Sequence, residues 1–407
     1  MCLKCRDCGV EYPPTIQYVC PRCFGALDVV YKDLDKIDLN PEKISKRGRD
    51  LWRYIELLPI KDPLNIVSLG AGFTSLIKSS KLSKSINLKK LYLKEDITNP
   101  THSFKDRAAS VAVSKALEFK LNAVGCASTG NLAAATAAHA ARAGLPCYIF
   151  APVGVEREKL SHASSYGARI VLVEGTYDEA NWIASRFAEE GNVGIVNVNI
   201  RPYYVEGSKT LAFEICEQLG WRAPEHIIIP MASGALLNAV YKGISELKNI
   251  GLIDGDVKIS GVQPEGCSPI ITAYKENRDY IKPVRDINTI AVSLAIGNPG
   301  DGVYALRTIR RTGGTAVSVT DREILEAIRD LARLEGLFIE PGGAVTIAGL
   351  KKMVDEGIVD RDEEVVCLLT GSGLKTPHII QEQVLQPIVI KPSHTELVKI
   401  LEVEKVA

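Results

Sequence analysis

The sequence predicts an α/β protein with two domains of parallel sheet, preceded by a small cysteine-rich segment. Between residues 91 and 189, short apolar runs alternate with longer helical patterns, as where Ala123–Cys126 precedes Leu132–Ala143. Such alternation is typical of βαβ units around a parallel sheet. The same rhythm resumes in three later apolar runs and indicates a second α/β domain; these runs are 227–229, 258–262 and 365–369.

Length and composition limit the class of protein. The chain has 407 residues, enough for two or three domains, and its 46% hydrophobic and 24% charged residues are typical of a soluble globular protein. Lys and Arg number 49, as do Asp and Glu, so no net charge attracts a phosphate backbone and we expect no nucleic-acid partner. The N-terminus lacks the apolar stretch of a secretory signal, and the longest uncharged interval, 121–141, contains several polar side chains. We therefore expect a cytoplasmic protein without a membrane segment.

Two cysteine pairs lie near the N-terminus. Cys5 and Cys8 form one Cys-x-x-Cys pair, and Cys20 and Cys23 form a second pair after eleven intervening residues. Four sulfurs at this spacing suit tetrahedral zinc in a closed site, with no open position for a substrate. We interpret the segment as a structural zinc ribbon of about 30 residues, too few to build a core alone. Free thiols without metal and a redox pair are the alternatives, and Cys2 lies outside the pattern.

One lysine lies where a proline-bearing turn meets the start of a helix, in the segment Asn99–Arg107. Ser103 or Thr101 can cap this helix, which leaves Lys105 near its positive end. A buried helix N-terminus disfavours the charged ammonium and favours the neutral amine that forms a Schiff base. Taken alone, however, such a lysine is more often a solvated surface residue.

Two further turns join an apolar strand to a helix. Ser128–Asn131 opens the alanine-rich helical pattern, and Ala232–Leu236 follows the apolar run 227–229. Small residues and free N–H groups at a helix start can bind a carboxylate or a phosphate. Each turn also fits an ordinary strand-to-helix connection, because a glycine-bearing turn is a weak pattern when it stands alone.

Together these segments resemble the lysine, substrate-carboxylate and cofactor-phosphate motifs of the fold type II pyridoxal-phosphate enzymes, and within them the threonine synthase family. Segments 201–210 and 369–375 resemble two further motifs of that family. The resemblance covers nearly the whole chain, and the zinc ribbon is similar to that of some archaeal and bacterial members. It implies two three-layer α/β/α domains and a small zinc ribbon. The expected bounds are 1–31 for the ribbon, 32–95 with 210–387 for a large cofactor-binding domain, 96–209 for a small mobile domain, and 388–407 for a C-terminal extension.

The resemblance also implies roles for single residues. Lys105 is expected to form the Schiff base with pyridoxal 5'-phosphate, Phe104 to lie beside the ring, Asn131 to bind the ring hydroxyl and Thr370 to face the pyridine nitrogen. Backbone N–H groups of one turn are expected to hold the cofactor phosphate; they belong to Ala232, Ser233, Gly234, Ala235 and Leu236. The substrate carboxylate is expected at Ser128, Thr129 and Asn131, and the substrate phosphate at Thr101, Ser103, Arg201 and Lys209.

The implied reaction converts O-phospho-L-homoserine and water to L-threonine and phosphate, in a homodimer whose small domain closes over the substrate. Two residues depart from the usual pattern of the family: Tyr204 stands where an arginine is common, and His102 stands where most members have glycine. The alternatives are an O-phospho-L-serine β-replacement enzyme such as cysteate synthase, and a serine/threonine dehydratase. A rival of another class is a zinc-ribbon adaptor without catalysis.

Overall fold

The computed structural model describes the chain except residues 156, 385–386, 395–397 and 399–407. It separates into two compact units, Met1–Lys375 and Thr376–Ala407. The second unit contains helix α14 (His378–Val384), and most of the expected C-terminal extension, 388–407, lies outside the described residues. Within the described part of the chain, no helix is long and apolar enough to cross a membrane.

The first 30 residues form a small antiparallel sheet. Its order is β2-β1-β3, with β1 at Cys2–Cys5, β2 at Glu11–Tyr12 and β3 at Leu27–Val30. Leu3, Leu27 and Val29 point to one side and are buried, because side chains alternate between the faces of a strand. They join a cluster that includes Tyr203 of the body, so this small sheet packs on the body.

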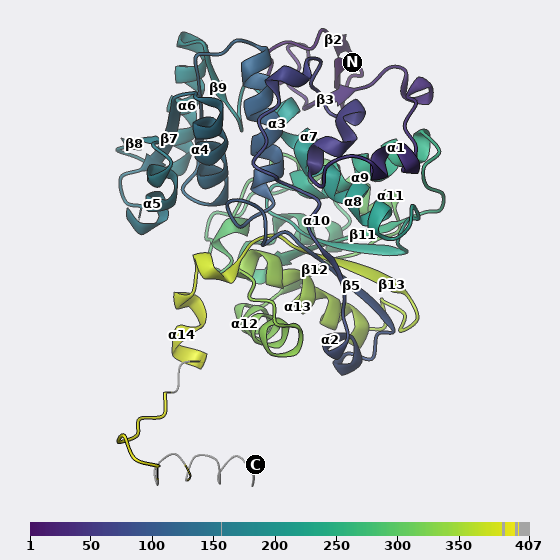
Figure 1. Ribbon diagram of the computed structural model, residues 1–407, viewed down its shortest axis with the longest axis vertical. Coiled ribbons are helices and arrows are strands. Elements are labelled where there is room, and N and C mark those ends of the chain that lie inside the picture. The colour runs from purple at the N-terminus through teal and green to yellow at the C-terminus, as the bar shows by residue number, and fades with distance from the viewer. Residues whose placement is uncertain (156, 385–386, 395–397, 399–407) are drawn as a thin grey trace. The chain divides into compact units, whose positions relative to one another are not determined.

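A four-stranded parallel sheet follows, in the order β8-β7-β6-β9 (Figure 1). Its strands are β6 (Ala123–Ala127), β7 (Cys147–Pro152), β8 (Arg169–Val173) and β9 (Val193–Ile195), and its helices are α3 (Lys105–Glu118), α4 (Asn131–Ala143), α5 (Arg157–Ser165) and α6 (Tyr177–Glu190). Val124 and Cys126 belong to the cluster with α3 and α4, whereas Ala123 and Ala127 belong to the cluster with α6. The sheet is therefore covered on both faces.

The other sheet has six strands in the order β12-β11-β10-β13-β5-β4, and only β4 runs antiparallel. Its strands are β4 (Leu76–Lys78), β5 (Lys90–Glu95), β10 (His226–Pro230), β11 (Lys258–Pro264), β12 (Ala316–Val319) and β13 (Glu364–Leu369). Helices α8 (Thr210–Gln218), α9 (Ala235–Asn249), α10 (Pro269–Lys275) and α11 (Gly302–Arg311) share a core with Ile227, Ile259 and Val366. Helix α13 (Pro341–Asp355), beside α12 (Asp321–Asp330), contacts the same strands (Figure 1).

The two parallel sheets confirm the predicted α/β class. The sequence-based prediction missed β4, β9 and β12, which are only three or four residues long and therefore carry little periodic signal. Helix α7 (Arg201–Ser208) lies between the layers and contacts both α3 and α9. The shorter elements are the helices α1 (Pro41–Ser45) and α2 (Lys81–Ser85), a π-helix at Leu331–Glu335, and 3-10 helices at Leu34–Lys36, Leu51–Leu57, Pro63–Asn65, Glu265–Cys267, Val292–Leu294 and Gly373–Lys375. The division into a large and a small mobile domain stays a prediction.

Candidate active site

The turn before α3 is held by its own side chains and by the C-terminal end of β13. The carboxylate of Asp106 accepts hydrogen bonds from the backbone N–H and the hydroxyl of Thr101, at 2.8 and 2.9 Å. The N–H of Phe104 donates to the carbonyl of Thr370 at 2.9 Å, and Ser103 pairs with Gly371 in an isolated bridge. Lys105 is therefore the first residue of a helix whose start is fixed on both sides.

His102, in the same turn, has a φ of 62°. This left-handed region favours glycine, because a Cβ atom there crowds the backbone. Among the described residues, the exposed His102 ring has a hydrogen-bond contact with the carbonyl of Ile97 at 3.2 Å and an electrostatic interaction with His162. The backbone conformation thus accounts for the glycine that most family members carry here, and it does not require a role for the imidazole.

We expect the His102→Gly variant to be as stable as the wild type or up to about 1 kcal/mol more stable, since relief of the left-handed strain slightly exceeds the entropy that glycine loses on folding. His102→Ala retains the Cβ atom and serves as the control, with no gain expected. Urea unfolding of the three proteins measures the difference. Glycine less stable than alanine would contradict this explanation.

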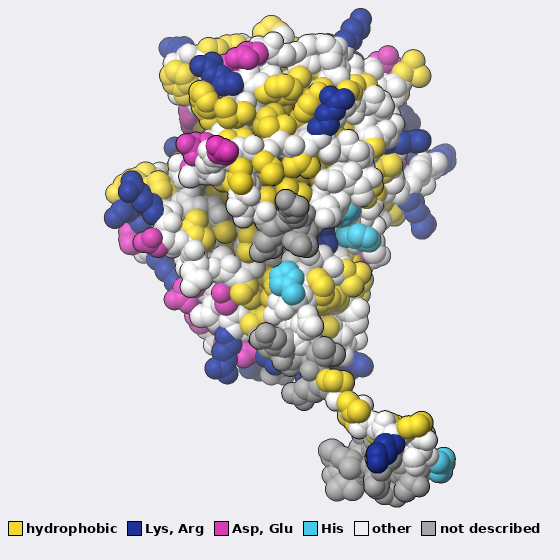
Figure 2. Space-filling view, turned by 90° about the vertical axis from the view of Figure 1, so that its left-hand side faces the viewer, with side chains coloured by type: hydrophobic (Ala, Val, Ile, Leu, Met, Phe, Trp, Pro, Cys, Tyr) yellow, Lys and Arg dark blue, Asp and Glu magenta, His cyan; other side chains and the backbone are white. Residues whose placement is uncertain are grey.

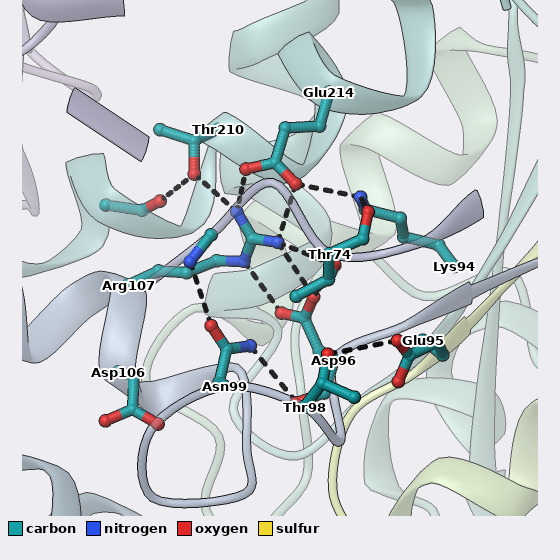
Figure 3. A network of polar contacts seen from close by, with 12 residues as sticks. Thr74, Lys94, Glu95, Asp96, Thr98, Asn99, Asp106, Arg107, Thr210 and Glu214 are labelled. Carbon is teal, nitrogen blue, oxygen red and sulfur yellow. Dashed lines mark hydrogen bonds and ion pairs between the residues drawn. The ribbon is translucent and has the colours of Figure 1, made fainter. Parts of the chain in front are cut away.

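Arg107 anchors the start of α3 in a buried ion cluster (Figure 3). Its guanidinium donates to Asp96 at 2.7 and 2.8 Å and also binds both carboxylate oxygens of Glu214. Lys94 lies 2.8 Å from the same glutamate. Burial alone would raise the pKa of Glu214, but the charges of Arg107 and Lys94 outweigh it and lower that pKa to about 2. The cluster joins β5, α3 and α8, and so fixes Lys105 relative to the six-stranded sheet.

The lowered pKa of Glu214 predicts how stability depends on pH. Because the folded pKa of about 2 is below the ordinary value of 4.5, the stabilisation is complete above about pH 4.5 and is lost as the pH falls toward 2. We expect Glu214→Gln to lower the free energy of unfolding by about 3 kcal/mol at about pH 6, since it leaves buried cations unpaired. The difference from the wild type should shrink at about pH 3.

The control for that series is Glu42→Gln, which removes a surface ion pair with Lys46 and should change the free energy of unfolding by less than about 0.5 kcal/mol at either pH. Denaturant unfolding of the three proteins at both pH values provides the measurement. A Glu214→Gln deficit that stays constant with pH would show that shape, rather than charge, is what the cluster contributes.

The side-chain amine of Lys105 contacts helix α7. Its Nζ donates to the hydroxyl of Tyr204 at 3.0 Å and lies 4.4 Å from the centre of the Phe104 ring. Arg201 lies three residues before Tyr204 and therefore on the same face of the helix. Its guanidinium pairs with the buried carboxylate of Asp301. Helix α7 thus presents one hydroxyl and one cation on the side of Lys105.

Asn131 begins α4, and the turn before it contains Ser128, Thr129 and Gly130. Its side-chain nitrogen lies 2.9 and 3.1 Å from the two carboxylate oxygens of Glu340, the residue before α13. Glu340 is buried, and burial raises the pKa of its carboxyl, against the hydrogen bond from Asn131. The N–H of Glu340 donates to the carbonyl of Gly371 at 3.0 Å, so Glu340 connects the segments 128–131 and 369–375.

The turn after β10 forms a tight cradle at the start of α9. Gly234 has a φ of 91°, and a Cβ atom there would lie 2.8 Å from Cβ of Ala305 and 3.0 Å from the carbonyl of Asp301. The carbonyl of Ser233 accepts a hydrogen bond from the N–H of Asp301 at 3.1 Å. Because Asp301 also pairs with Arg201, the cradle and α7 are held together.

These contacts bring the cradle, the lysine turn, Thr370 and Asn131 together, and the residues fit pyridoxal phosphate. The first N–H groups of α9 have no partner within their own helix, so they are available to a phosphate. The buried Ser103 hydroxyl has no hydrogen-bond partner among the described residues, and the Lys105 amine binds only a neutral hydroxyl there. A polar ligand next to Lys105 would satisfy these groups.

Two of the residues expected at the substrate phosphate are engaged elsewhere. The ammonium of Lys209 is buried between Glu206, at 2.6 Å, and Glu246, at 2.8 Å. The hydroxyl of Thr101 is bound to Asp106. Neither side chain is free, whereas the Ser103 hydroxyl has no hydrogen-bond partner among the described residues, and Arg201 lies about one helical turn before Tyr204, which binds the Lys105 amine.

The four N-terminal sulfurs lie together at the edge of the small sheet. The Sγ atoms of Cys5, Cys8, Cys20 and Cys23 are all within 4.8 Å of one another, and a set of this kind could hold a zinc ion. Arg6, between the first two, donates to Asp28 at 2.6 and 2.8 Å and lies 3.4 Å from Asp301. The cysteine segment therefore contacts the residue that pairs with Arg201.

Comparison with known proteins agrees with this geometry. Residues 67–371 match the family model described as pyridoxal-phosphate dependent enzyme. The chain is 42% identical to threonine synthase of Methanocaldococcus jannaschii, over 99% of this chain and 100% of that protein. The chain belongs to the threonine synthase family. It is also 42% identical to threonine synthase of Methanosarcina acetivorans, over 95% of each chain.

Solved structures share the fold at lower identity. Threonine deaminase isoform 2 from Solanum lycopersicum has a TM-score of 0.66 and 22% identity, covering 83% of this chain and 96% of that one. Maize serine racemase has a TM-score of 0.63 and 20% identity, covering 82% and 93%. They confirm the fold type II architecture that the resemblance implied for this threonine synthase family member.

Sequence reasoning missed three residues of the site: Tyr204, Asp301 and Glu340. Tyr204 carried a signal, since it departs from the usual pattern of the threonine synthase family. Glu340 stands directly before Pro-Gly-Gly at a helix start, and a carboxylate at that position indicates a polar role that the sequence could have suggested. Asp301 carried none, because its importance comes only from contacts with Arg201 and Ser233.

Proposed function

We propose that the chain converts O-phospho-L-homoserine and water to L-threonine and phosphate. The observation that carries this proposal is the 42% identity to a threonine synthase over 99% of the chain, which includes every motif that meets around Lys105. The solved structures carry only the fold, because their identities are below 25%.

Pyridoxal phosphate supplies an electron sink next to the reacting carbons. Lys105 would hold it covalently, with Phe104 beside the ring, Asn131 at the ring hydroxyl and Thr370 at the pyridine nitrogen. The N–H groups of the turn Ala232–Leu236 would bind its phosphate. The positive φ of Gly234, 91°, shapes that turn at the start of α9.

The protein's own groups would move the protons and bind the substrate. Lys105 would take protons from the α and β carbons and return them to the γ and α carbons, and the Tyr204 hydroxyl at 3.0 Å would orient its amine. Ser128, Thr129 and Asn131 would bind the substrate carboxylate at the start of α4. Phosphate leaves from the γ carbon, and water then adds at the β carbon.

For the substrate phosphate we propose Ser103 and Arg201. The Ser103 hydroxyl is buried without a partner among the described residues, and the Arg201 guanidinium binds one carboxylate while it keeps further donors free. We leave Thr101 and Lys209 out of this site, because Asp106 and two glutamates already bind them.

We also propose that the protein is a homodimer in the cytoplasm. None of the ten cysteines forms a disulfide, as expected of a reducing compartment. Leu172 on the edge strand β8 is 50% exposed and Trp182 on α6 is 58% exposed. Figure 2 shows hydrophobic side chains gathered on one face of the molecule. Light scattering of the purified protein would measure the oligomeric state.

Incubation of the protein with pyridoxal phosphate and O-phospho-L-homoserine tests the function, with phosphate and L-threonine measured in the same sample. Equal release of the two products is the expected result. O-phospho-L-serine is assayed in parallel, because it differs by one methylene. Turnover of phosphoserine alone would move the function to β-replacement, and no turnover of either substrate would overturn the proposal.

A further inference from the structure

Glu340 is a buried carboxyl group within the cofactor site to which the proposed reaction assigns no role. It stands one residue before α13, and its N–H donates to the carbonyl of Gly371 at 3.0 Å. Its neighbour Ile339 pairs with Ser372 in an isolated bridge. The Glu340 side chain thereby lies between the C-terminal cofactor motif and Asn131, 6% exposed.

The C-terminal motif leaves space for this side chain. A Cβ atom at Gly371 would lie 2.3 Å from Oε1 of Glu340, and one at Gly373 would lie 2.7 Å from the ring of Phe338. Such distances are far below van der Waals contact. The glycines of the segment 369–375 are therefore required by the residues at 338 and 340, and not only by the turn of the chain.

The contact between Glu340 and Asn131 determines how the carboxamide is turned. An amide nitrogen carries two hydrogens, whereas the amide oxygen is only an acceptor. Both carboxyl oxygens of Glu340 face the nitrogen of Asn131, at 2.9 and 3.1 Å, so one N–H is used there. The second N–H is left for the cofactor. With the amide reversed, its oxygen would repel an ionised ring oxygen.

We propose that Glu340 is a positioning residue that fixes the Asn131 carboxamide with an N–H toward the ring oxygen of pyridoxal phosphate. The inference rests on the proposed function, since it requires that cofactor at Lys105 and Asn131. It adds that the orientation of Asn131 is set by a residue 209 positions away in the chain.

The test compares pyridoxal-phosphate binding by the wild type, Glu340→Ala and Glu340→Gln, measured by equilibrium dialysis. We expect Glu340→Ala to bind about tenfold more weakly, the effect of losing one oriented hydrogen bond. Glu340→Gln keeps an acceptor oxygen for Asn131 and should stay within about threefold of the wild type. Glu335→Ala is the control, because it removes a carboxylate that binds the N–H groups at the start of α2, away from Lys105.

Two further readouts separate positioning from a loss of stability. The absorption of bound cofactor in Glu340→Ala should shift toward the shorter-wavelength band of the protonated ring oxygen, since an N–H donor favours the ionised form. In an Asn131→Ala background, Glu340→Ala should weaken binding no further, because Glu340 acts through Asn131. Should Glu340→Ala fail to fold, Glu340→Met fills the volume without an acceptor and takes its place.

The outcomes are distinguishable. A wild type that does not bind pyridoxal phosphate would overturn the proposed function. A wild type that binds it, with Glu340→Ala binding equally well, would overturn the role of Glu340 alone. Additive losses in the Asn131→Ala background, or an equal loss in Glu335→Ala, would also overturn that role.

Discussion

The Lys105→Ala variant should lose at least about 10³-fold of its threonine-forming activity, because the side chain both holds the cofactor and moves the protons. Folding should be unaffected, since the ion cluster of Arg107, and not Lys105, fixes the start of α3. The assay measures threonine and phosphate together. A second measurement, mass spectrometry after borohydride reduction, should locate the cofactor on Lys105 in the wild type.

The matched control is Lys89→Ala, which removes an exposed lysine paired only with Asp362 among the described residues. Its activity should equal that of the wild type. Full activity in Lys105→Ala, or a reduced cofactor attached to another lysine, would contradict the assignment of the site.

Removal of one proposed zinc ligand should lower stability strongly. We expect Cys20→Ser to abolish zinc binding and to lower the free energy of unfolding by more than about 2 kcal/mol, because so short a segment has little core of its own. Leu3 and Val29 of that segment pack in one cluster with Tyr203 of α7. Activity should fall as well, since Arg6 contacts Asp301, the partner of Arg201.

Metal analysis and denaturant unfolding measure both effects. Cys2→Ser is the control, because this buried cysteine lies outside the four-sulfur cluster and its loss should leave zinc bound. Prolonged treatment with a strong chelator should reproduce the Cys20→Ser result in the wild type. A wild-type protein that contains no zinc and remains stable would show that the segment folds with free thiols.

Much of the fold could be predicted because local patterns of apolar and polar residues specify its strands and helices. The apolar runs at 123–126 and 227–229 became β6 and β10, each between helices, because a strand buried on both faces must be apolar throughout. The short strands β9 and β12 could not be predicted. Three or four residues are too few to show a periodic pattern. These strands form because they hydrogen-bond to the edge of a neighbouring strand.

The sequence likewise predicted some residues of the candidate site and not others. Lys105, Asn131 and Thr370 were singled out by motifs, and their roles remain predictions. Nothing in the sequence near Lys209 argued against its expected role in binding the substrate phosphate. Folding, however, buries its ammonium against Glu206 and Glu246. A buried cation requires a charged partner, and the second of these partners comes from α9.

The sequence by itself determined the alternation of the longer strands and helices, the four cysteines of the N-terminal segment and the turn that carries Lys105, because each depends on residues close together in the chain. Only the tertiary structure decided which side chains meet in the site. Lys105 and Tyr204 are 99 residues apart, Arg201 and Asp301 are 100 apart, and Asn131 and Glu340 are 209 apart. Such pairs form where packed helices and sheet edges approach one another, and no local pattern encodes that approach.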